Sequence, residues 1–193
     1  MDFIVLQKIM RRLALEAGGA IMEVYNSDDF KVKTKSDASP VTAADEAADA
    51  IISAGLRAAF PGVTLITEEQ AESHALKGTE FLIVDPLDGT KEFVHRRGDF
   101  TVNIAYVVDG IPIRGIVYAP AKQRLFYTNA LGQSLEETGS FEMEKIGACQ
   151  NISVAIPNPN GLRVVASKSH PNQTTDSYIA KYPVSDLKSA GSS

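Results

Sequence analysis

The sequence is poor in cysteine and in long apolar runs, and both shortages limit what the protein can be. A single cysteine, Cys149, excludes an intrachain disulfide and a cysteine-based zinc cluster, which favours a reducing compartment. No run of about 18 apolar residues could cross a membrane, and the first residues do not resemble a signal peptide. We therefore expect a cytoplasmic protein with Cys149 buried as a small side chain. Peripheral attachment to the inner membrane stays open.

Positive charge is also scarce. The chain has 19 Lys and Arg against 24 Asp and Glu, which gives a formal net charge of −5. The one local basic cluster, His95-Arg96-Arg97, is too short to grip a phosphate backbone, so nucleic acid is excluded as a partner. A small anionic substrate is still compatible with this charge, because a bound metal can reverse the field inside a cleft.

The pattern of the first 150 residues predicts an α+β domain. Apolar residues at three-four spacing predict a long amphipathic helix, and a second helix begins at Thr42, with Asp45 completing a capping box, and ends at Pro61-Gly62. Short strands are expected over residues 63–66 and 81–84, the second of them buried on both faces. Residues 100–108 and 111–118 flank Asp109-Gly110, a strong hairpin signal, and residues 125–128 add a strand. We expect two helices on an antiparallel sheet.

The pattern restarts after about residue 150. A strand over residues 162–166, a helix after Pro171 and a strand over residues 184–188 indicate the start of an α/β domain. One helix and two strands cannot build a sufficient core. We therefore expect an N-terminal domain over residues 1–150, and over residues 151–193 an incomplete C-terminal domain whose remainder is truncated.

Acidic residues follow two of the predicted strands. Glu68 comes after the first, and Asp85-Pro86-Leu87-Asp88-Gly89-Thr90 follows the second. Carboxylate and carbonyl oxygens are the ligands Mg²⁺ prefers, and Gly89 allows the backbone to approach a phosphate closely. Asp-Pro followed by Asp-Gly is also ordinary turn chemistry. Spacing alone leaves a turn and a metal site as equal alternatives.

Three motifs carry a family resemblance. The string DPLDGTKEF, Asp85 to Phe93, resembles the signature of the inositol monophosphatase superfamily of Mg²⁺ phosphatases. Residues 35–45 are similar to its K-x-D-x-S-P-V-T-x-A-D stretch, and residues 66–69 to its I-G-E-E, with Thr67 in place of the usual glycine. The resemblance implies a layered αβαβα sandwich. Within the superfamily, Lys91-Glu92-Phe93 resembles the bacterial 3′(2′),5′-bisphosphate nucleotidases, which hydrolyse adenosine 3′,5′-bisphosphate to AMP and phosphate in sulfate assimilation.

The resemblance also implies the roles of the site residues. Metal ligands would be Glu68, Asp85, the Leu87 carbonyl and Asp88, holding two Mg²⁺ ions, with Asp37 as a candidate ligand of a third. Catalytic roles fall to Asp45, Glu68 and Thr90. The substrate would contact Glu68, Leu87, Asp88, Gly89 and Thr90. A homodimer is an assembly found among such relatives.

One departure from the family matters. Members supply a further aspartate from a Trp-Asp motif near the C-terminus, and this chain has no tryptophan. We therefore expect the 193-residue form to bind Mg²⁺ weakly and to have little activity. Two other functions stay open: an inositol monophosphatase or sugar-phosphate phosphatase with the same metal core, and a metal-binding fragment without catalysis.

Overall fold

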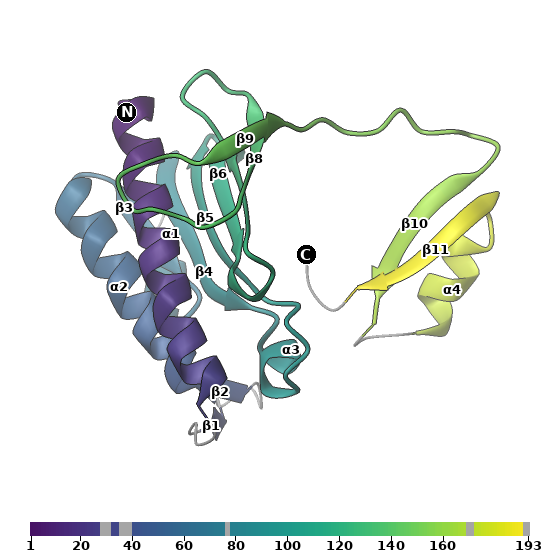
Figure 1. The fold of residues 1–193 in the computed structure, drawn as a ribbon, viewed down its shortest axis with the longest axis horizontal. Helices are drawn as coiled ribbons and strands as arrows, with labels where there is room; N and C mark the ends of the chain where they lie inside the picture. The colour runs from purple at the N-terminus through teal and green to yellow at the C-terminus, as the bar shows by residue number, and fades with distance from the viewer. Residues whose placement is uncertain (28–31, 35–39, 76–77, 169–171, 191–193) are drawn as a thin grey trace.

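The main body of the protein is a seven-stranded sheet with two long helices on one face (Figure 1). The computed structural model describes residues 1–27, 32–34, 40–75, 78–168 and 172–190. In spatial order the strands are β3 (Thr64–Thr67), β4 (Glu80–Asp88), β5 (Thr101–Val108), β6 (Ile111–Ala119), β7 (Arg124–Thr128), β8 (Ser134–Thr138) and β9 (Ala148–Asn151). A separate antiparallel pair, β1 (Val32–Thr34) and β2 (Pro40–Thr42), precedes the second helix. This is the expected α+β class.

The sheet is mixed, whereas the sequence predicts it to be antiparallel. Strand β3 runs parallel to β4, and every later pair is antiparallel. The reason lies in residues 68–79, which include the short 3-10 helix η1 (Ala71–Ala75). A connection of about a dozen residues is long enough to return the chain to the same end of the sheet, as a parallel pair requires. Strands β3 and β4 therefore both end at the same edge.

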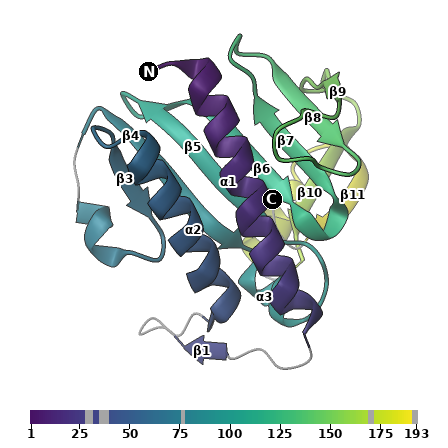
Figure 2. The same ribbon diagram turned by 60° about the vertical axis from the view of Figure 1, so that its left-hand side comes forward.

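Helices α1 (Phe3–Asn26) and α2 (Ala43–Ala59) lie side by side on one face of the sheet (Figure 2). The Asp2 side chain caps α1 by accepting hydrogen bonds from the amides of Ile4 at 2.9 Å and Val5 at 3.2 Å. The two helices approach closely at Gly55, where the lack of a side chain leaves room for Leu13. A Cβ at this position would lie 2.3 Å from a Leu13 methyl group. The buried leucines, isoleucines and valines between helices and sheet form the core.

The other face of the sheet has no helix packed on it in the described part of the chain. Residues 81–84 were predicted to be buried on both faces, and this is wrong for Ile83, which is 41% exposed. Leu82 and Val84 point into the core, as alternation along a strand requires. The uncovered face carries the carboxylates described below.

The hairpin prediction is confirmed. Strands β5 and β6 pair antiparallel, and Asp109 and Gly110 join them with positive φ values of 50° and 76°. Two successive residues in that region form the turn whose twist matches the flanking strands. Strands β8 and β9 were not predicted.

An ion pair ties α1 to β8. Arg11 donates from Nε to Glu137 Oε2 at 2.9 Å and from Nη2 to Glu137 Oε1 at 2.7 Å, and the two side chains are 4% and 0% exposed. Arg11 also donates to the carbonyls of Glu142, Met143 and Lys145. Nearby, Cys149 is exposed rather than buried, because β9 is an edge strand.

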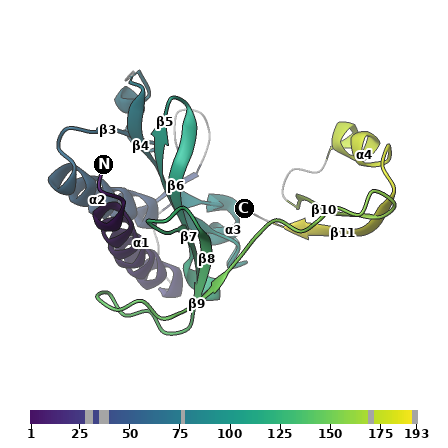
Figure 3. The same ribbon diagram turned by 90° about the horizontal axis from the view of Figure 1, so that it is seen from above.

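Strands β10 (Leu162–Ser167) and β11 (Val184–Ala190) form a separate parallel pair linked by α4 (Gln173–Ile179). Residues 152–161 connect this unit to β9, and the unit stands apart from the main sheet (Figures 1 and 3). Asn172 caps α4 through the Thr175 amide at 2.8 Å, whereas Pro171 lies outside the described residues. Among the helices described, none combines the length and apolar character needed to cross a bilayer.

Candidate active site

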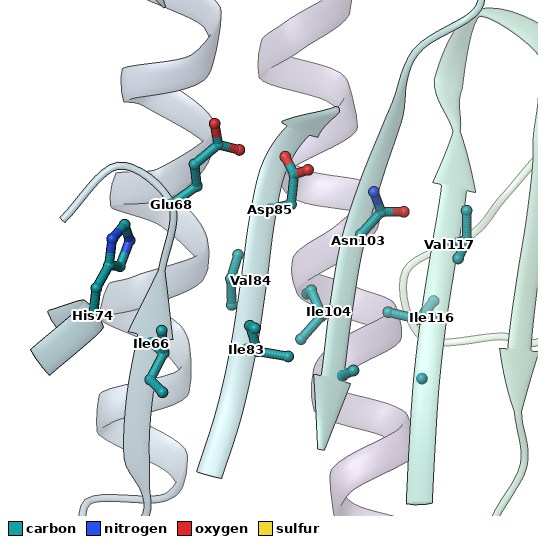
Figure 4. A pocket seen from close by; sticks show the side chains of 12 residues that line it. Ile66, Glu68, His74, Ile83, Val84, Asp85, Asn103, Ile104, Ile116 and Val117 are labelled. Atoms are coloured by element: carbon teal, nitrogen blue, oxygen red, sulfur yellow. The ribbon is translucent and has the colours of Figure 1, made fainter. Parts of the chain in front are cut away.

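Polar side chains from three neighbouring strand regions meet on the uncovered face of the sheet. Glu68 directly follows β3, Asp85 lies near the end of β4 and Asn103 lies opposite Asp85 on β5. Figure 4 shows the three side chains at the same level and pointing the same way. Because β3 and β4 are parallel, their carboxyl ends bring Glu68 and Asp85 to one edge.

An irregularity in β4 brings Asp88 to the same face as Asp85. Asp85 pairs with Asn103 and Asp88 pairs with Thr101, so three steps along β4 match two along β5. Residues three apart on a regular strand point to opposite faces, but one extra residue reverses this. Pro86 lies in the extra stretch, where it does not have to donate a ladder hydrogen bond. The bulge thus places both carboxylates on the uncovered face.

Asp85 is held in an unfavourable electrostatic environment. Burial, the negative charges of Glu68 and Asp88, and a side-chain hydrogen bond with Glu68 together raise the pKa of its carboxyl group from 3.8 to about 7, against a hydrogen bond from the Leu87 backbone that lowers it. Its Oδ1 atom is buried and has no hydrogen-bond partner. A buried carboxylate oxygen without a donor is costly and is the kind of group that a cation compensates.

Asn103 belongs to this arrangement, although sequence reasoning did not single it out. Its Oδ1 atom is also buried without a hydrogen-bond partner. The sequence placed it only within the strand expected over residues 100–108, and its closeness to Asp85 depends on the register between β4 and β5. A side-chain amide oxygen is a neutral ligand or acceptor beside the acidic group.

The turn after Asp88 leads into a short helix, α3 (Thr90–Val94). Gly89 adopts the left-handed conformation with φ 87°, which a residue with a Cβ adopts only with strain. The Thr90 hydroxyl donates to the Leu87 carbonyl at 3.2 Å. Phe93 packs α3 against the core, and its ring centroid lies 5.2 Å from those of Tyr25 and Phe100.

The structure places Asp45 as the third residue of α2, 3% exposed. Helices α2 and α3 both contact β2, so the first turns carrying Asp45 and Thr90 belong to neighbouring elements. Asp37, the candidate ligand of a third ion, lies outside the described residues.

A pocket of about 730 Å³ adjoins the acidic group. Glu68, Asp85 and Asn103 form its polar end, His74 lies at one side, and apolar residues of β3–β6, mostly isoleucines and valines, line the remainder. Among the residues that the structure describes, His74 is the one basic side chain in the lining, and no lysine or arginine lies there, so a bound cation would favour entry of an anionic ester.

The donor set suits Mg²⁺, which takes carboxylate and carbonyl oxygens. The orphaned oxygen of Asp85 and its like-charged neighbours fit a cation in place of the missing donor. Among the residues that the structure describes, however, no three Asp, Glu, His or Cys side chains already converge on one point.

Comparison with known proteins agrees with this architecture. Residues 5–193 match the model of the inositol monophosphatase family. The chain is 39% identical over 188 residues to the 3′(2′),5′-bisphosphate nucleotidase CysQ of Buchnera aphidicola, covering 94% of this chain and 66% of that protein. It is 40% identical over 185 residues to CysQ of Escherichia coli K12, covering 94% of this chain and 71% of that protein.

A solved structure gives the same result. The crystal structure of CysQ from Bacteroides thetaiotaomicron, a bacterial member of the inositol monophosphatase family, matches with a TM-score of 0.75 and 31% identity, over 96% of this chain and 73% of that one. The protein belongs to the inositol monophosphatase family. It is similar to CysQ nucleotidases of that family, and it spans about two thirds of their length (66% of the Buchnera protein).

Proposed function

We propose that the protein is a Mg²⁺-dependent phosphatase that hydrolyses adenosine 3′,5′-bisphosphate to AMP and phosphate in sulfate assimilation. The observation that carries the proposal is Asp85, a carboxylate with a buried unpartnered oxygen beside Glu68 and Asp88. The substrate class comes from the CysQ relatives, which are 3′(2′),5′-bisphosphate nucleotidases.

The proposed metal ligands are Glu68, Asp85, Asp88 and the carbonyl of Leu87. Asp85 interacts electrostatically with both of the other carboxylates, so it would be the natural bridge between two ions. In the described residues the three carboxylates do not converge on one point, so we propose that Glu68 and Asp88 move slightly toward Asp85 when an ion binds. When bound, Mg²⁺ supplies charge neutralisation at the phosphoryl oxygens and lowers the pKa of water.

The other residues handle the attacking water and the ester. Thr90 would orient the water, since its hydroxyl already lies 3.2 Å from the carbonyl of Leu87, a proposed metal ligand. Asp45 would accept a hydrogen bond from Thr90 and so align it. Glu68 would take the proton that the water loses. The amide of Gly89 and the Thr90 side chain would contact the phosphate of the substrate.

A phosphate-release assay on the purified protein tests the proposal. Adenosine 3′,5′-bisphosphate, inositol 1-phosphate and fructose 1,6-bisphosphate would be compared with Mg²⁺ and with excess chelator. We expect the adenosine ester to be hydrolysed fastest and chelation to abolish release. Preference for the inositol or sugar ester would assign the alternative phosphatase function, and no release with any ester would favour the non-catalytic metal-binding alternative.

Three further expectations from the sequence belong to this proposal. We propose that residues 1–150 form one domain carrying the site and that residues 151–193 contribute to a second. We also propose a cytoplasmic location and a homodimeric assembly. Light scattering of the purified protein checks the assembly.

A further inference from the structure

A buried acidic residue that the proposed mechanism does not use lies directly behind Glu68. Asp49 is on the sheet-facing side of α2 and is 7% exposed. In the described part of the chain no lysine, arginine or histidine forms a salt bridge with it. Three side chains donate to it instead. These donors are Thr67 Oγ1 to Oδ1, Ser53 Oγ to Oδ1 at 3.2 Å, and Gln70 Nε2 to Oδ2 at 2.8 Å.

The amide, the carbonyl and the hydroxyl of Thr67 each have a hydrogen-bond partner. Its hydroxyl donates to Asp49, and its amide donates to Ser73 Oγ at 3.1 Å. Its carbonyl accepts from Ser73 Oγ at 3.2 Å and lies 2.9 Å from His74 Nε2. Thr67 is 0% exposed, so these bonds are shielded from water and strongly favoured over broken ones.

Glu68 is the next residue, and its side chain turns the other way. Strand alternation sends Thr67 toward α2 and Glu68 toward Asp85 on the uncovered face (Figure 4). The Glu68 amide donates to the Val84 carbonyl at 3.1 Å, which fixes the backbone against β4. The hydroxyl of Thr67 therefore ties the residue that precedes Glu68 to a fixed point on α2.

We propose that Asp49 and Thr67 form a positioning pair that holds Glu68 at the distance from Asp85 needed to bind a divalent cation. The inference rests on the proposed function, because it gives Glu68 a role as a metal ligand. The threonine stands where the family motif has glycine, which could make no such bond. A glycine at this position would leave the backbone before Glu68 without a side-chain bond. In this chain the Thr67 hydroxyl supplies that bond, to Asp49 on the helix-covered face of the sheet.

The test uses isosteric substitution and magnesium calorimetry. Thr67→Val keeps the shape of the side chain but removes the hydroxyl, whereas Thr67→Ser keeps the hydroxyl. Ser53→Ala is a matched control, since Ser53 also donates to Asp49, whereas its hydrogen bonds among the described residues are to Asp49 and Gln70 and not to β3. Mg²⁺ affinity is measured by calorimetry with no substrate present, and thermal unfolding is recorded for each variant.

We expect Thr67→Val to weaken Mg²⁺ binding about tenfold, as loss of a group that orients a ligand does. Thr67→Ser should stay within about twofold of the wild type, and so should Ser53→Ala even where its unfolding temperature falls. Equal affinity in the wild type and Thr67→Val, or equal weakening by Thr67→Val and Ser53→Ala, would overturn the proposal.

The calorimetry separates this inference from the proposed function. Wild-type protein that binds Mg²⁺ but releases no phosphate would contradict the phosphatase function, and the Thr67→Val affinity would still decide the positioning role. Wild-type protein that binds no Mg²⁺ would overturn both. In an active enzyme, Thr67→Val should lower turnover at limiting Mg²⁺ and regain most of it at saturating Mg²⁺, with the KM for the ester nearly unchanged.

Discussion

Asp85 and Asn103 lie directly opposite each other on adjacent antiparallel strands, and one side-chain oxygen of each is buried without a hydrogen-bond partner. Buried polar atoms in folded proteins are nearly always paired. Two orphaned oxygens side by side therefore mark a place where the fold accepts an energetic cost. In the proposed function a cation offsets that cost.

Replacing Asp85 by asparagine should separate stability from function. The substitution removes a buried charge that two neighbouring carboxylates repel, so metal-free protein should unfold at a higher temperature. Phosphate release should fall at least about 100-fold, because the substitution removes a proposed ligand of the ion. Calorimetry of metal-free protein and steady-state assays check the two effects. A variant that is less stable and fully active would contradict the assignment.

Metal-free stability should depend on pH through Asp85. The pKa of this carboxyl group is raised from 3.8 to about 7, so between these values the folded protein keeps a proton that the unfolded chain has released. The contribution of Asp85 to stability is therefore full at low pH and is lost as pH rises through this window.

The measurement is the difference in unfolding temperature between wild type and Asp85→Asn in chelator. Groups that do not interact with Asp85, including Glu136 with its lowered pKa, cancel in this difference. The unfolding temperature of the wild type should fall relative to that of the variant between about pH 4 and pH 7 and then level off. Added Mg²⁺ should restore the wild type at pH 8 but not the variant. A difference that is constant with pH would contradict the role of Asp85.

The turn at Gly89 should not tolerate a side chain. Its φ of 87° is in the left-handed region, so Gly89→Ala should destabilise the protein by about 1 kcal/mol or more and displace Thr90. Gly62→Ala is the control, because Gly62 has open space around its Cβ position and no positive φ. Chemical denaturation and phosphate release check both. Equal effects of the two substitutions would mean that the turn is not under strain.

The ion pair of Arg11 and Glu137 should contribute far more to stability than a partly exposed pair on the same helix. Arg11→Ala leaves Glu137, 0% exposed, without its partner and should cost about 3–5 kcal/mol. Arg12→Ala breaks the surface pair with Glu16 and should cost about 0.5 kcal/mol or less. Urea unfolding distinguishes them, and similar losses would show that the Arg11 pair is solvated.

The sequence predicts those elements whose signal is local. The β5–β6 hairpin follows from Asp109-Gly110, since two residues that accept positive φ specify the turn by themselves. Strand β8 was missed because Glu136 and Glu137 look like surface residues. They are buried because Arg124 on β7 and Arg11 on α1 neutralise them and Gln150 and the Gly147 amide donate to them, and Arg11 is 126 residues away from Glu137 in sequence.

Local motifs likewise predicted some residues of the candidate site and missed others. Glu68, Asp85 and Asp88 were expected because they form contiguous motifs next to strands. Asn103, Asp49 and the anchoring role of Thr67 were not, because each depends on the register of β4 and β5 or on how α2 packs on β3. Whether Asp45 meets Thr90 is likewise a prediction from the family motif.

The extra residue in β4 has a consequence for how this segment can vary. Because three residues of β4 match two of β5 between Asp85 and Asp88, the facing of Asp88 depends on the number of residues in that interval. Removing or adding one codon there would rotate Asp88 into the layer of helices while leaving Asp85 in place. Substitutions at Pro86 should therefore be milder than any single-residue change in length.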